Sequence, residues 1–257
     1  MERLINWKAI GKSVTGTSHI SSSKPCEDAV HYAIVAAPDN TDVLISCVCD
    51  GAGSALYAAE SSQFATNYIV EKLSIIATNG KIIEEGDIYN LVEEVYHELA
   101  FKAAVANVSI NEYSCTVLGC YITTDQAAFF HIGDGAIIRN DGTDFYNAIW
   151  WPFNGEYQNI TSFIVDSATL YNLNITIINE QINEVAMFTD GLQLIALNME
   201  ALNVHQPFFN DLFGSLKLAD TNEKVNILNV KLEAYLNSER INERCDDDKT
   251  LFMATRK

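Results

Sequence analysis

The stretch V-L-I-S-C-V-C-D-G-A-G-S, residues 43–54, decides the fold. Its first seven residues are almost all apolar, and an aspartate, two glycines and a serine follow within the next five positions. A short, continuous apolar run is typical of a strand that is buried on both faces. Because Asp-Gly ends the run, the chain is expected to turn there and to present a carboxylate at the end of a buried strand.

Acidic turns recur beside other apolar runs. They are C-E-D at 26–28, H-I-G-D-G at 131–135, F-T-D-G at 188–191 and D-D-D-K-T at 246–250. Each is ordinary turn chemistry by itself, but several carboxylates that converge on one point would repel each other unless cations lie between them. Magnesium and manganese prefer oxygen ligands of this kind. The sequence therefore favours a metal-dependent enzyme whose site is assembled from strand ends.

The rest of the sequence groups strands and helices into blocks. Extended segments or strands are expected at 4–18, 29–37, 43–49, 114–123, 127–132, 136–139, 172–178, 184–189 and 249–255. Helices are expected at about 55–77, 84–106, 191–197, 207–216 and 222–237. This order indicates an α+β fold with antiparallel sheets, and two packed sheets with helices on their outer faces would use all of the elements. No linker interrupts the chain, so a single domain over 1–257 is expected.

Composition excludes several classes of function. The chain has 34 acidic and 16 basic residues, a net charge of −18. The sequence contains no Lys/Arg cluster that could bind the phosphate backbone of a nucleic acid. The negative charge of the chain would also repel an anionic membrane, so neither nucleic acid nor membrane is expected as a partner. No apolar run reaches the roughly 18 residues of a membrane span, and the N-terminus lacks a signal-peptide pattern. A cytoplasmic protein is therefore expected, and its six cysteines, none in a CxxC pair, are interpreted as reduced thiols.

Taken in order, the motifs resemble those of a known family. They are C-E-D-A at 26–29, V-C-D-G-A-G-S at 48–54, Y-S-C-T-V-L-G at 113–119, H-I-G-D-G-A at 131–136, M-F-T-D-G-L at 187–192 and D-D-K-T-L at 247–251. The chain is similar to the type 2C, metal-dependent serine/threonine protein phosphatases, and most similar to their bacterial branch. The resemblance implies a four-layer α-β-β-α sandwich, a two-metal centre between the ends of the sheets, and a phosphorylated protein as substrate.

The resemblance also implies the catalytic carboxylates. Asp50 would bridge two Mn²⁺ or Mg²⁺ ions, and Asp190 and Asp247 would complete the ligands of the first ion. Asp248 stands where many relatives have Asn, which favours Asp247 as the ligand. Two such ions would supply a hydroxide at neutral pH and clamp the phosphoryl oxygens for in-line attack, so that no phosphoenzyme is needed.

Further positions follow from the same resemblance. Glu27 and the carbonyl of Gly51 would serve the second ion, with Asp28 in a supporting, catalytic position. Asp134 matches the position that holds a third, weaker ion in some members. Leu194, four residues after Asp190, stands where many relatives have another acid, which argues against that third ion.

The group that would hold the substrate phosphate is left open. Family members often place an arginine where this chain has Ser23, so Lys24 or His19 is expected to take its role, although either could be a plain surface residue. Animal-type members have a histidine directly after the first Asp-Gly, where this chain has Ala52. That difference leaves a water at the metals, or His19, as proton donor to the leaving group.

An irregular aromatic segment at 140–165 occupies the place of a mobile flap in the family. Its Glu156, Asn159 and Thr161 could touch substrate or order the loop, and the segment could equally be an aromatic loop that packs on the sheet edge. Asn159 is taken as the substrate-binding candidate.

Two other functions compete with the phosphoprotein phosphatase. One is a catalytically weak module that binds a phosphorylated partner, and the other is a phosphatase of small phosphate esters. Clustered carboxylates would destabilise a fold that no longer bound metal, which argues against the first, and no base-stacking or phosphate-cradling motif supports the second. The sequence does not indicate whether the protein is a monomer or an oligomer.

Overall fold

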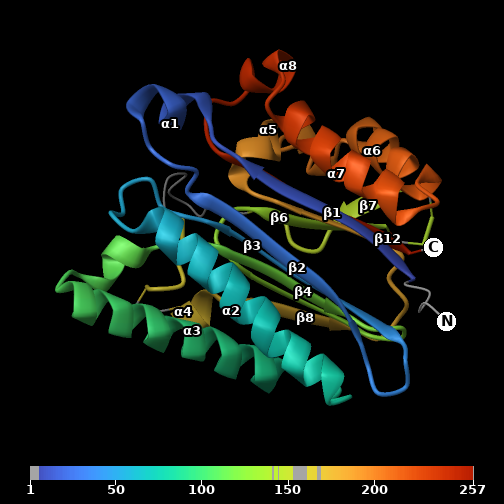
Figure 1. Ribbon diagram of the computed structural model, residues 1–257, viewed down its shortest axis with the longest axis horizontal. Coiled ribbons are helices and arrows are strands. Elements are labelled where there is room, and N and C mark those ends of the chain that lie inside the picture. Colours follow the sequence, from blue (N-terminus) through green and yellow to red (C-terminus); the bar gives the residue numbers. More distant parts are fainter. Residues whose placement is uncertain (1–5, 141, 144, 153–160, 167–168, 257) are drawn as a thin grey trace.

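Two five-stranded antiparallel sheets pack face to face, and helices cover their outer faces (Figure 1). The computed structural model describes residues 6–140, 142–143, 145–152, 161–166 and 169–256. The first sheet has the order β1 (Trp7–Val14), β12 (Lys249–Arg256), β9 (Glu184–Phe188), β6 (Ala136–Asn140), β7 (Tyr146–Ala148). The second sheet has the order β2 (Asp28–Ala36), β3 (Asp42–Asp50), β4 (Val117–Ile122), β5 (Ala127–Ile132), β8 (Asn174–Ile178). The predicted four-layer sandwich is confirmed.

Helices lie on both outer faces of the sandwich (Figure 1). The second sheet is covered by α2 (Ala58–Thr78) and α3 (Glu85–Ala106), with α4 (Thr169–Asn172) beside them. On the first sheet lie α5 (Gln193–Ala196), α6 (Gln206–Leu218), α7 (Asn222–Leu236) and α8 (Glu239–Asn242), together with the small hairpin of β10 (Leu197–Asn198) and β11 (Asn203–Val204). The remaining elements are α1 (Thr17–Ser22) and the 3₁₀ turns η1 (Ile110–Tyr113) and η2 (Asp190–Leu192).

Strand β3 contributes to two of the three apolar layers of the core. Side chains alternate between the two faces of a strand, so Ile45 and Cys47 pack toward α2 and α3, whereas Leu44 and Val48 pack between the sheets. All four are fully buried. Burial of each aliphatic side chain stabilises the fold by about 1.5–3 kcal/mol, which is why this strand reads as an unbroken apolar run. A third apolar layer lies between the first sheet and α5–α8.

The strand register brings the acidic turns to one end of the sandwich. Asp28, the first residue of β2, lies opposite Asp50, the last residue of β3. In the other sheet, Phe188 at the end of β9 lies opposite Leu251 near the start of β12. The turn that follows β9 and the turn that precedes β12 are therefore neighbours at the end of the molecule that also carries α1 (Figure 1).

Two local expectations were wrong. Residues 17–22 form α1, although the sequence suggested an extended segment to residue 18, because the Ser18 amide donates to the Asp246 carbonyl (2.9 Å), a contact across the whole chain. Strand β7 lies inside the stretch that was expected to be irregular, and Gln206 hydrogen-bonds both the amide and the carbonyl of Tyr146. Most other predicted elements occur within a few residues of their expected bounds.

All six cysteines lie among the described residues, and each is a free thiol. Among the helices that the structure describes, none combines the length and apolar character of a membrane span.

Gly119 tests the packing of the second sheet. It lies opposite Phe130, and a Cβ at this position would fall 1.9 Å from the Phe130 ring, which is fully buried. We expect Gly119→Ala to lower the free energy of unfolding by about 1–3 kcal/mol, measured by urea denaturation.

The matched control is Gly86→Ala on α3, where an added Cβ meets nothing within 4 Å. It should leave the free energy of unfolding unchanged or raise it by about 1 kcal/mol. Equal midpoints for both variants would contradict the tight pairing of β4 with β5.

Candidate metal centre

Asp50 is held at the end of β3 by its backbone. Its amide donates to Thr116 Oγ1 (2.9 Å), and its carbonyl accepts from the Thr116 amide (2.8 Å). At Gly51 a Cβ would fall 2.6 Å from the Ala58 carbonyl oxygen, so no side chain fits between β3 and the start of α2. The Asp-Gly pair thus aims one carboxylate outward from the strand while the backbone of α2 approaches closely.

The second Asp-Gly turn uses the same device. A Cβ on Gly191 would fall 2.1 Å from the carbonyl oxygen of Asp248, so the missing side chain lets this turn lie directly against the D-D-D-K-T turn. One carboxylate oxygen from each of Asp50, Asp134 and Asp190 lies within 4.8 Å of the other two. Three acids from three separate turns therefore converge, as the sequence suggested.

These acids line a cavity of about 310 Å³. The cavity brings together all six residues predicted to bind metal, which are Glu27, Asp50, Gly51, Asp134, Asp190 and Asp247. His19 lines it too, along with Ser18, Ala52, Gly53, Thr116, Thr161 and Phe163. Among these, Thr116 is a residue that sequence reasoning missed, although it lies in the motif Y-S-C-T-V-L-G.

Asp28 supports the cluster from behind. It is buried, and its Oδ2 accepts hydrogen bonds from the hydroxyls of Thr189 and Thr250, each at 2.8 Å. Its Oδ1 is buried without a hydrogen-bond partner among the described residues. The two threonines were not predicted, and the signal was their position, one residue before Asp190 and two after Asp248.

Asp248 fastens the N-terminal segment to the site. It is 3% exposed, its Oδ1 accepts from the Gly16 amide (2.6 Å), and its Oδ2 accepts from the Glu27 amide (2.5 Å). His19 Nδ1 lies 2.9 Å from the same Oδ2. Asp247 lines the cavity, whereas Asp248 is absent from its wall and instead accepts hydrogen bonds from the N-terminal segment.

The candidates for holding phosphate lie at two places. His19 is on the cavity wall, with Nε2 3.7 Å from Glu27 Oε2. Lys24 lies just outside, where its Nζ donates to the Gly53 carbonyl (2.7 Å) and to Glu27 Oε1 (3.3 Å). Asn159 and Glu156 lie outside the described residues. Thr161 is described, and its hydroxyl donates to Asp134 Oδ2 (2.6 Å).

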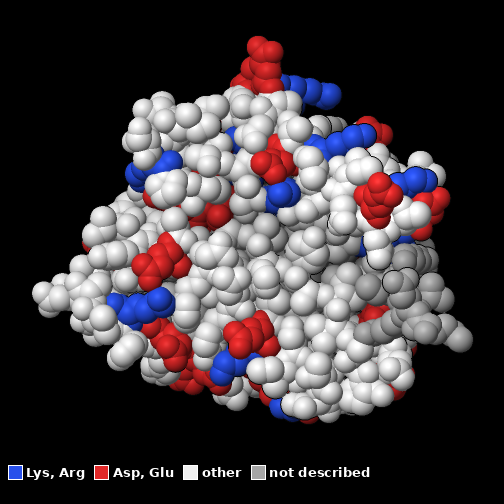
Figure 2. Space-filling view, viewed as in Figure 1, with Lys and Arg blue, Asp and Glu red and all other residues white. Residues whose placement is uncertain are grey.

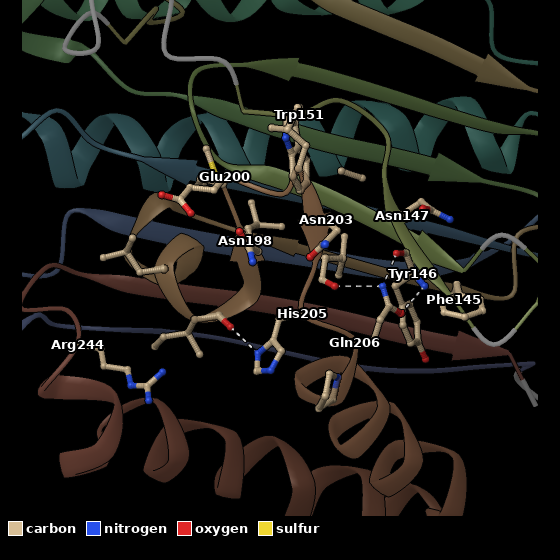
Figure 3. Close-up of a pocket in the computed structure, with 18 residues that line it drawn as sticks. Phe145, Tyr146, Asn147, Trp151, Asn198, Glu200, Asn203, His205, Gln206 and Arg244 are labelled. Atoms are coloured by element: carbon tan, nitrogen blue, oxygen red, sulfur yellow. Dashed lines mark hydrogen bonds between the residues drawn. The ribbon is translucent and has the colours of Figure 1, made fainter.

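A larger cavity of about 1120 Å³ lies elsewhere, between β7, α5, the β10–β11 hairpin and the start of α6 (Figure 3). In this view Phe145 and Tyr146 lie on one side of it, and His205 and Arg244 lie on the other. None of the predicted metal-binding residues lines it. Leu194, which stands where many relatives have an acid, is 75% exposed and lines this cavity rather than the acidic one. The larger cavity is therefore not the one that the predicted metal-binding residues line.

Burial makes the acidic cluster costly without a cation. Burial raises the pKa of Asp28 to about 8, against the hydrogen bonds from Thr250 and Thr189, and it raises the pKa of Asp190 to about 6 with help from the Asp134 charge. Burial and the charges of Asp28, Asp190 and Asp134 raise the pKa of Asp50. Within the described part of the chain, the buried oxygens Glu27 Oε2 and Asp28 Oδ1 accept no hydrogen bond, and an all-oxygen donor set of this kind fits a hard divalent cation.

Comparisons with known proteins agree with this geometry. The sequence model of the family Protein phosphatase 2C matches residues 15–237. Over 251 residues the chain is 34% identical to Serine/threonine-protein phosphatase 3 of Escherichia coli (strain K12), covering 97% of this chain and 98% of that protein. The chain therefore belongs to the protein phosphatase 2C family, the metal-dependent serine/threonine protein phosphatases. The predicted class of enzyme, a protein phosphatase, is confirmed.

Solved structures share the fold at low sequence identity. Serine/threonine phosphatase Stp1 from Staphylococcus aureus matches with a TM-score of 0.60 and 16% identity, covering 99% of this chain and 97% of that one. RsbX in complex with magnesium matches with a TM-score of 0.54 and 14% identity, covering 100% of this chain and 98% of that one. These likenesses concern the fold.

The raised pKa values predict how stability depends on pH without metal. The folded protein holds a proton on Asp28 that the unfolded chain releases, so the stability from that proton is present below the ordinary pKa of 3.8 and is lost as the pH rises through about 8. We expect metal-stripped protein to melt at a higher temperature at pH 6 than at pH 8, measured by calorimetry in EDTA.

Asp28→Asn should reduce the difference in melting temperature between pH 6 and pH 8. Asp246→Asn, which changes an exposed acid next to Asp247, should preserve that difference. Manganese added at pH 8 should raise the melting temperature of the unsubstituted protein. Identical melting temperatures at both pH values would show that the buried acids carry no such cost.

Proposed function

We propose that the protein hydrolyses phosphoserine and phosphothreonine in proteins by direct attack of a water that two Mn²⁺ or Mg²⁺ ions activate. The observation that carries the proposal is the convergence of Asp50, Asp134 and Asp190 in a small cavity, where burial and neighbouring carboxylates raise the pKa values of Asp50 and Asp190. Ions held there would lower the pKa of a water and neutralise the phosphoryl oxygens. We place the activity in the cytoplasm.

The chain's own residues would divide the task. Asp50, Asp190 and Asp247 would hold one ion, and Glu27 with the Gly51 carbonyl would hold the other with Asp50 shared between them. Asp134, already hydrogen-bonded to Thr161, is the candidate for a weaker third ion. Asp28 would act as a positioning residue through its hydrogen bonds to the two threonines that flank the metal-binding turns.

Lys24 is the better of the two candidates for binding the substrate phosphate. Its ammonium group lies beside Glu27 at the rim of the cavity, and its side chain is 40% exposed, so it can turn toward an incoming anion. His19 faces two buried acids, Glu27 and Asp248, which favours a role in orienting them. A lysine in this place would bind phosphate as a point charge.

The metal-dependent reaction gives the first test. We expect metal-stripped protein to be inactive on a phosphothreonine peptide and to gain activity with manganese. Asp50→Asn and Asp247→Asn should each lower kcat/KM by more than roughly 100-fold, because each removes a charged ligand of the ions.

Asp246→Asn is the matched control, since Asp246 is the exposed neighbour of Asp247 and lies off the cavity wall. It should keep full activity. Equal loss in Asp246→Asn and Asp247→Asn would contradict the assignment of the ligands. Manganese binding without turnover would support a phosphopeptide-binding module, and turnover confined to p-nitrophenyl phosphate would support a phosphatase of small esters.

Substitution of Lys24 tests the phosphate-binding role. Lys24→Gln should raise KM for the peptide by about tenfold with a smaller effect on kcat, since a charge-assisted hydrogen bond contributes about 1.5–3 kcal/mol. Lys12→Gln, on a lysine that pairs with Glu233 on the far side of β1, is the control and should leave KM unchanged. A rise in KM for His19→Gln but not for Lys24→Gln would reverse the two assignments.

A further inference from the structure

A groove lies at the start of α2, beside the cavity of about 310 Å³ that the acids line, which we call the metal cavity. This α2 groove, of about 840 Å³, is walled by Lys24, Pro25, Leu56, Glu60, Val108 and Glu112 and by the small residues between them. It shares Glu27 and Gly53 with the metal cavity, so the two hollows adjoin each other. A peptide whose phosphorylated side chain enters the cavity has this groove directly beside it.

One wall of the α2 groove is the turn at 52–57, which is fixed to η1. Glu112 Oε2 accepts from the Leu56 amide (2.8 Å), and the Glu112 carbonyl accepts from the Tyr57 amide (2.9 Å). The rings of Tyr57 and Tyr113 stack at 4.7 Å below the turn. The Leu56 side chain is nonetheless 71% exposed on this fixed turn. A rigid turn that holds an apolar side chain in water offers a contact surface at little cost in conformational entropy.

The charges of the α2 groove are mainly negative. Glu27, Glu60 and Glu112 line it against one cation, Lys24, which already pairs with Glu27. Glu60 pairs with Lys102 through Oε1, its side chain is 47% exposed, and its Oε2 makes no hydrogen bond within the described part of the chain. Figure 2 shows acidic side chains interspersed with lysines over the face that α2 and α3 form. The groove therefore complements a cationic side chain.

We propose that the α2 groove binds the part of the substrate polypeptide that flanks the phosphorylated residue, and that it selects substrates with a lysine or arginine there. The basic side chain would lie between Glu60 and Glu112, and an apolar neighbour would pack on Leu56. The inference rests on the proposed function, because it assumes a phosphopeptide in the metal cavity. It adds the sequence preference that the cavity itself lacks.

The test is kcat/KM on matched phosphothreonine peptides with manganese. Each peptide carries a single arginine or a single glutamate about two to four residues from the phosphothreonine on either side, a distance that an extended chain covers within such a groove. We expect the best arginine peptide to exceed its glutamate counterpart by roughly fivefold to tenfold, as two partly exposed ion pairs allow. The ratio should fall as salt is raised.

The double variant Glu60→Gln, Glu112→Gln should lose most of this ratio. Glutamine keeps an oxygen that can accept from the Leu56 amide, so the turn is expected to stay in place, and equal melting temperatures would confirm that. Glu94→Gln is the matched control, because Glu94 pairs with Lys72 across the same two helices (2.9 Å) but lies outside the groove. It should keep the ratio of the unsubstituted protein.

Hydrolysis of p-nitrophenyl phosphate separates the possible failures. Equal kcat/KM for arginine and glutamate peptides, or a ratio that survives in the double variant, would overturn the groove assignment and leave the phosphatase intact. Turnover of p-nitrophenyl phosphate without any phosphopeptide hydrolysis would overturn the proposed function and the groove together. A dimer in sedimentation experiments that Leu56→Ser converts to monomer, without a change in peptide preference, would show that a second copy covers the groove.

Discussion

Mutual repulsion among clustered carboxylates, some buried and some half-buried, is the constraint on which the rest of this structure depends. Like charges a few ångströms apart in a poorly hydrated site cost several kcal/mol unless protons or cations compensate them. Here the acids come from five turns that the antiparallel register places at one end of the two sheets. Burial, and then the charges of neighbouring carboxylates, raise the pKa values of Asp28, Asp50 and Asp190. Binding of divalent cations to such a cluster would offset this electrostatic cost and stabilise the fold.

Backbone geometry, more than side-chain bulk, holds the cluster together. Gly51 and Gly191 each sit where a Cβ would collide with a neighbouring carbonyl, so the turns pack backbone against backbone. Asp248 then ties the Gly16 and Glu27 amides to β12, and the fully buried Lys249 donates to the Asp247 carbonyl (2.9 Å). The acids that face the cavity are thus positioned by close backbone packing and by hydrogen bonds from neighbouring turns.

The sequence predicted what local patterns control and missed what the register creates. The run at 43–49 identified a strand buried on both faces, and Asp-Gly turns after apolar strands identified Asp50, Asp134 and Asp190 as a group. No local pattern could show that Thr189 and Thr250 share one oxygen of Asp28, or that His19 lies against Asp248, because those contacts join residues more than 150 positions apart. Helix α1 was missed for the same reason, since its start is held by Asp246.

The size of the metal cavity separates catalysis from substrate choice. At about 310 Å³, and lined mainly by acids, glycines and hydroxyls, it has room for a phosphoryl group but little for the flanking polypeptide. A phosphoryl group looks the same in every phosphoprotein, so the cavity can supply rate without supplying sequence preference. Selectivity must then come from surfaces that adjoin the cavity and do not touch the reacting atoms. The fixed turn at 52–57 is one such surface, because it follows Gly51, which lines the cavity, and is held by Glu112 at its other end. Substitutions along that turn can change which substrates fit while leaving the carboxylates in place.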